Sequence, residues 1–108
     1  MAGRARPAKA DSTVPASASR WDAAEVQYLG DRRVRLSVIK DGVTRHAVVQ
    51  LDPVDGHGED IFKRAEMLQI VEVWAQRLNA GQTDLGPRVE LQIEKNVYAL
   101  PVRAFEEV

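Results

Sequence analysis

The sequence contains no cysteine, few aromatic residues and no long uninterrupted apolar run. Without cysteine the chain cannot form disulfides, bind zinc or iron–sulfur clusters through thiolates, or use a cysteine nucleophile. Without an apolar run of about 18 residues it offers no membrane span, and its start lacks the apolar core of a secretory signal. We therefore expect a cytoplasmic protein that does not associate with membranes.

Net charge is also nearly absent, at −1 over 108 residues, so the whole molecule is not an electrostatic partner for nucleic acid. The charge is unevenly distributed, however. Residues 1–20 carry four basic residues against Asp11 and sum to +3, which leaves −4 for the remainder. This segment has one large aliphatic residue, Val14, and cannot bury enough apolar surface to order itself. We predict a disordered or partner-ordered basic arm over 1–20 and a single domain over 21–108.

The clearest local pattern is a pair of alternating apolar and polar segments, 34–40 and 43–51, on either side of Asp41-Gly42. Such a pair favours a two-residue hairpin turn, because glycine tolerates the positive φ that the turn requires. Pairing Lys40 with Val43 collects the apolar residues on one face, so we prefer that register. A third strand over 24–29, joined by a three-residue loop that aligns Tyr28 with Val34, matches the same face.

Residues 59 to about 80 carry apolar side chains at three- and four-residue spacing, which predicts one long helix ending before Gly81. The stripe that we expect to face the sheet comprises Ile61, Ala65, Leu68, Val71, Ala75 and Leu78, widened by Met67 and Trp74.

A second hairpin is predicted from the segments 88–94 and 97–102, with a turn at Lys95-Asn96 that pairs Ile93 with Tyr98. Pro101 cannot donate a ladder hydrogen bond, so we expect the last strand to be an edge. The predicted fold class is therefore α+β: a five-stranded antiparallel sheet, in the chain order βββαββ, with one long helix packed on one face.

The segment from Asp52 to Asp60 concentrates carboxylates, His57 and two glycines, which is the composition of a divalent-metal site. Its spacing departs from the calcium-loop pattern, and it is not followed by the Lys-Ser/Thr pair of a phosphate-binding loop. A strand-to-helix turn explains the same residues. We expect no metal and no cofactor, although metal binding by this loop stays open.

Catalysis would need titratable groups that converge in a pocket, and the chain has only two histidines. His46 lies opposite Ser37 in the preferred register, with no predicted acid to orient it and no oxyanion donors, as in an ordinary polar contact. We expect no enzyme; an active site would have to form around His57 or at an oligomer interface.

Apolar residues outside the predicted core point to an interaction surface. On the expected helix, Phe62, Ile70 and Val73 point away from the sheet. Such a flank predicts a protein contact. The preferred hypothesis is a small non-enzymatic protein-interaction module, such as an accessory subunit, adaptor or inhibitor, with a homodimer as one form. The edge strands of an open sheet offer a second route, by strand addition.

A nucleic-acid-binding regulator is the alternative hypothesis, because basic residues occur in the arm and near the outer face of the first three strands. They are Arg4, Arg6, Lys9, Arg32, Arg33 and Arg35. Sheets that bind RNA display aromatic residues on such a face, whereas both tyrosines and Trp74 are expected in the core here. Eleven arginines against four lysines, with abundant alanine and valine, are typical of a GC-rich bacterial genome.

Overall fold

The structure is a computed structural model and describes residues 20–53 and 56–108. It has the predicted α+β architecture and chain order, with five antiparallel strands in one sheet and one α-helix packed on a face. The elements are β1 (Asp22–Gly30), β2 (Arg33–Lys40), β3 (Val43–Leu51), the 3-10 helix η2 (Gly58–Phe62), α1 (Arg64–Asn79), β4 (Arg88–Ile93) and β5 (Asn96–Glu107).

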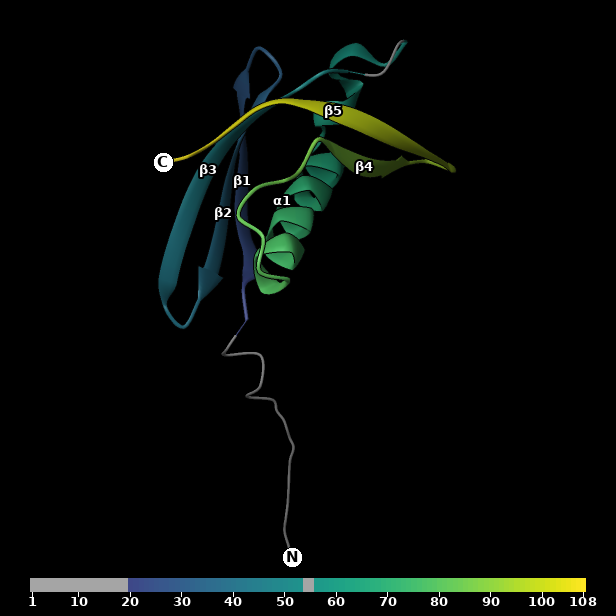
Figure 1. The fold of residues 1–108 in the computed structure, drawn as a ribbon. Coiled ribbons are helices and arrows are strands. Elements are labelled where there is room, and N and C mark those ends of the chain that lie inside the picture. Colours follow the sequence, from purple (N-terminus) through teal and green to yellow (C-terminus); the bar gives the residue numbers. More distant parts are fainter. Residues whose placement is uncertain (1–19, 54–55) are drawn as a thin grey trace, which may run out of the picture.

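The sheet has the spatial order β1-β2-β3-β5-β4 and curls around α1. Figure 1 shows β5 arching from its hairpin with β4 across to β3. As a result α1 contacts β4 as well as β1 and β2. The core lies between the helix and this curled face, and its largest fully buried side chain is Trp74. No helix among the described residues is long and apolar enough to cross a membrane.

The first two hairpins have the strand alignment expected from face matching. Every pair from Arg33↔Gln50 to Lys40↔Val43 follows the predicted register of β2 and β3. Their turn places Asp41 at φ 52° and Gly42 at φ 80°, the left-handed conformation that a two-residue hairpin loop needs. Tyr28 pairs with Val34 as expected, although an irregularity after Tyr28 shortens the turn itself to two residues.

The register predicted for the β4–β5 hairpin is wrong by two residues. The turn is Glu94-Lys95, so Ile93 pairs with Asn96 and Leu91 pairs with Tyr98. Glu94 adopts φ 57° to make this turn. Side chains alternate with a period of two, so a shift by two residues keeps every apolar residue on its face. Face matching therefore could not distinguish the two registers.

The expectation that Pro101 marks an edge strand is also wrong, because β5 lies between β3 and β4. Pro101 sits where β5 passes from one neighbour to the other: it pairs with Arg88 of β4, and Val102 pairs with Leu51 of β3. Its carbonyl accepts a hydrogen bond from the Asp52 N–H (3.0 Å). A proline is tolerated in an inner strand at this change of partner.

The long helix begins later than predicted, and its core-facing side is rotated. Lys63 is extended (ψ 157°) and separates η2 from α1. The buried residues of α1 are Met67, Ile70, Val71, Trp74 and Ala75. The orientation predicted for the flank of Phe62, Ile70 and Val73 is wrong, since Phe62 and Ile70 are buried and Val73 is half-buried against the core. Phe62 stacks on Tyr28 of β1, with ring centroids 5.0 Å apart. The curl of the sheet also brings β4 against α1, over a flank that a flat sheet would leave exposed.

Candidate interaction surface

The face of the sheet that points away from α1 is covered by no described helix or strand. We call the part of this face formed by β1, β2, β3 and the end of β5 the outer sheet surface. Its residues, taken from the strand registers, are Glu25, Gln27, Arg33, Arg35, Ser37, Ile39, Thr44, His46, Val48, Gln50, Ala104 and Glu106. Most of these side chains are exposed, whereas His46, Val48 and Gln50 are half-buried and Ser37 is buried. The surface is therefore a solvated polar face with one apolar residue near its centre.

Charged side chains of both signs lie on the outer sheet surface. Arg33 and Arg35 are exposed on β2, and they are flanked by Glu25 on β1 and Glu106 on β5. None of these four side chains forms an ion pair with another described residue.

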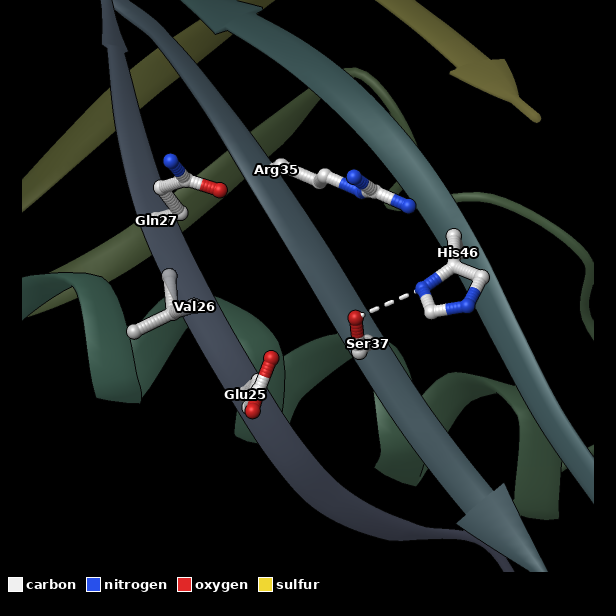
Figure 2. Close-up of a pocket in the computed structure, with 6 residues that line it drawn as sticks. All are labelled: Glu25, Val26, Gln27, Arg35, Ser37 and His46. Carbon is white, nitrogen blue, oxygen red and sulfur yellow. Dashed lines mark hydrogen bonds between the residues drawn. The ribbon is translucent and has the colours of Figure 1, made fainter.

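A shallow hollow of about 110 Å³ lies on the same surface, around the cross-strand pair of Ser37 and His46. Ser37 Oγ and His46 Nδ1 are 2.8 Å apart, as the register predicts. Figure 2 shows Glu25 on the β1 side of Ser37, opposite His46. A nucleophilic serine needs an acid that orients its histidine, so this carboxylate is on the wrong side. The row forms a polar contact and not a catalytic triad.

The acidic segment before α1 uses its side chains in contacts within the chain. Asp52 Oδ1 accepts a hydrogen bond from Arg103 (3.1 Å) and lies 4.0 Å from Arg32 Nη1. Glu59 Oε2 accepts a hydrogen bond from the Tyr28 hydroxyl (3.3 Å). Across residues 20–53 and 56–108, no three histidine or acidic side chains are grouped so as to hold a metal ion. Asp55, a further carboxylate of this segment, lies outside the described residues.

The basic residues proposed for nucleic-acid binding are only partly described. Arg4, Arg6 and Lys9 lie outside the described residues, as does the arm itself up to residue 19. Arg32 is half-buried in the turn after β1, near Asp52. Of the whole set, the structure places only Arg33 and Arg35 on the outer sheet surface.

Side-chain amides of α1 bind the backbone of both edge strands. At the start of β1, Asn79 Oδ1 accepts from the Trp21 N–H (2.6 Å) and Asn79 Nδ2 donates to the Trp21 carbonyl (2.9 Å). At β4, Gln69 Oε1 accepts from the Gln92 N–H (2.7 Å) and Gln69 Nε2 donates to its carbonyl (2.8 Å). Each amide occupies the position of a further strand. These contacts satisfy the outward backbone groups of one residue at each edge, Trp21 just before β1 and Gln92 in β4.

A cluster of Arg45, Glu107 and Trp21 lies on the side of the sheet that faces α1. Glu107 accepts two hydrogen bonds from Arg45, from Nε (2.6 Å) and Nη2 (2.5 Å). The Arg45 guanidinium also lies over the ring of Trp21, 5.3 Å from its centroid. Hydrogen bonding from Arg45, aided by its positive charge and opposed by burial, lowers the pKa of the Glu107 carboxyl.

This pair predicts a pH-dependent contribution to stability. Because the folded pKa of Glu107 lies below the unfolded one, the contribution is present at neutral pH and is lost as the pH falls through the folded pKa. Both side chains are about a third exposed, so we expect less than about 1 kcal/mol. Glu107→Gln should destabilise the protein at pH 7 in urea unfolding and should destabilise it less at pH 3. A Glu90→Gln control should be neutral at both values, and equal losses at both for Glu107→Gln would contradict the assignment.

Sequence reasoning missed Glu106 and the two amide contacts. The sequence predicts that the last strand ends at Val102, whereas β5 runs to Glu107. A register shift between Val102 and Ala104 interrupts the alternation there and hides the rest of the strand. Gln69 and Asn79 carry no sequence signal for edge binding, since their partners are 23 and 58 residues away.

Comparison of the chain with protein-family models, curated proteins and solved structures finds no match.

Proposed function

We propose that the protein is a small non-enzymatic protein-interaction module, acting as an accessory subunit, adaptor or inhibitor, and that it binds its partner through the outer sheet surface. The observation that carries the proposal is the set of charged side chains on this uncovered face that have no ion-pair partner among the described residues. A cytoplasmic location and a bacterial origin remain predictions from the sequence.

The mixture of charges supports a protein partner over a nucleic acid. A surface that binds the phosphate backbone presents basic residues without adjacent acids, because carboxylates repel phosphate. Here Arg35 lies one strand from β1, which carries Glu25, and two strands from β5, which carries Glu106. Aromatic side chains for base stacking are also missing from this surface: Tyr28 and Trp74 pack on the other side of the sheet.

The test compares captured proteins among three full-length baits: the wild type, Arg35→Glu and a control, Arg64→Glu. Arg64 is exposed at the first turn of α1, away from the outer sheet surface. We expect a partner that the wild type and Arg64→Glu retain in equal amounts and Arg35→Glu loses. Baits with two different tags reveal whether that partner includes a second copy of the chain. Capture of the same proteins by all three baits would refute the use of this surface.

The alternative of nucleic-acid binding is supported by one observation, the adjacent exposed pair of Arg33 and Arg35. It predicts salt-dependent binding to a labelled oligonucleotide, with a shallower salt dependence after Arg33→Glu and Arg35→Glu. In fluorescence anisotropy at low salt, we expect that any oligonucleotide binding by the wild type is unchanged by these two substitutions. The opposite result would favour the alternative over the protein-interaction module.

A further inference from the structure

The central row of the outer sheet surface runs across four strands. Its members are paired in register: Gln27 with Arg35, Arg35 with Val48, and Val48 with Glu106. Neighbouring strands lie about 5 Å apart, so Arg35 and Glu106 are at nearly equal distances on opposite sides of Val48. The row therefore has an apolar centre, a positive charge on one side and a negative charge on the other.

The two charges do not pair with each other within the chain. No ion pair joins Arg35 or Glu106 to any other described residue. Figure 2 shows the Arg35 side chain directed from β2 toward β3. Both side chains are exposed.

We propose that a second copy of this chain binds the outer sheet surface. The two copies are related by a two-fold axis that lies between the two sheets, runs parallel to β3 and passes over Val48. In an isologous contact, residue i meets residue j and j meets i. The axis places Val48 against Val48 of the second copy, and Arg35 against its Glu106 at two symmetric positions. The inference rests on the proposed use of this surface and names the partner.

The neighbouring row fits the same axis. Gln50 follows Val48 by two residues on β3, so the two copies of Gln50 meet at the axis. Each Nε2 donates one N–H to the Asp31 carbonyl of its own chain (3.1 Å), which leaves its second N–H for the Oε1 of the other copy. Arg33, its neighbour on β2, then lies opposite Ala104 and meets no like charge. The amide contacts at Trp21 and Gln92 occupy one residue at each sheet edge, whereas the outer sheet surface has no such contact from α1.

Charge reversal tests the pairing directly. Sedimentation equilibrium of the full chain should give a dimer, with a dissociation constant that Arg35→Glu and Glu106→Arg each raise at least about tenfold. Each single reversal creates two like-charge contacts across the axis. The double variant restores opposite charges and should return the dissociation constant to within about threefold of the wild type. Arg64→Glu and Glu72→Arg, on exposed positions of α1, are the matched controls and should leave it unchanged.

Two results would overturn the inference. The first is a wild type that stays monomeric at millimolar concentration. The second is a double variant that is folded by circular dichroism but stays as weak as the single variants. If the wild type is a monomer in sedimentation equilibrium, but Arg35→Glu still loses a different protein in the capture experiment, the dimer is disproved and the interaction module is retained. Failure of both experiments removes both proposals.

Discussion

Trp74→Ala should remove about 3–5 kcal/mol from the free energy of unfolding, a large part of the roughly 5–15 kcal/mol expected for a domain of this size. Trp74 is fully buried between α1 and the curled sheet. Its ring contacts Phe105 edge to face, with centroids 5.5 Å apart, and so joins the helix to the last strand. Alanine leaves a cavity that the helix, held by both sheet edges, cannot close. Urea unfolding followed by far-ultraviolet circular dichroism measures the loss.

Trp74→Phe is the matched control. Phenylalanine keeps most of the buried area and the contact with Phe105, and it loses the 3.4 Å hydrogen bond from Nε1 to the Thr83 carbonyl. We expect a cost of about 1–2 kcal/mol, well below that of alanine. A Trp74→Ala variant that lost less than about 1 kcal/mol would show that the side chain does not support the packing of α1 on the sheet.

The sequence was sufficient to predict the strands and most of their alignment, because each face of the sheet has a different environment. A one-residue slip of β3 against β2 would bury His46 and expose Val49. The alternation of side chains therefore excludes any shift by an odd number of residues. It cannot exclude a slip of two residues. The β4–β5 hairpin shows this limit: Leu91 meets Tyr98 where Leu100 was expected, and both partners are apolar.

The helix orientation could not be predicted, because it depends on the curl of the sheet. A flat sheet would contact one narrow stripe of α1, and Ile70 would then lie outside it. The curl brings β4 to the helix and buries Ile70 completely. At Pro101 β5 leaves its local hairpin with β4 and pairs with β3, where Val102 meets Leu51, 51 residues away in the chain.

The candidate surface was predictable only in part, for the same reason. The arginines of β2 and the Ser37–His46 pair follow from a local hairpin, which alternation reveals. The position of Glu106 beside Val48 depends on the pairing of β5 with β3, which joins residues 58 positions apart in the chain and carries a register shift. A self-complementary row across four strands therefore becomes visible only in the folded sheet.

Replacing both edge-binding amides should destabilise the protein by about 2 kcal/mol, the second-largest effect that we expect. Gln69→Ala and Asn79→Ala each remove two hydrogen bonds to an edge strand. The released backbone groups can bind water, so each substitution costs only about 1 kcal/mol. The sites are ten residues apart on α1, about 15 Å, and share no partner, so the two effects should add. Urea unfolding of the single and double variants measures them.

Hydrogen exchange distinguishes edge protection from a general loss of helix stability. In Gln69→Ala the Gln92 amide should exchange faster while the Trp21 amide is unchanged, and Asn79→Ala should give the reverse. Gln69→Glu keeps an acceptor for the Gln92 N–H but places a carboxylate against the Gln92 carbonyl. The Gln69→Glu variant should therefore be no more stable than the Gln69→Ala variant. Uniformly faster exchange across the sheet would contradict local protection. A double variant that also forms large oligomers through its freed edges would show that the amides direct association to the outer sheet surface.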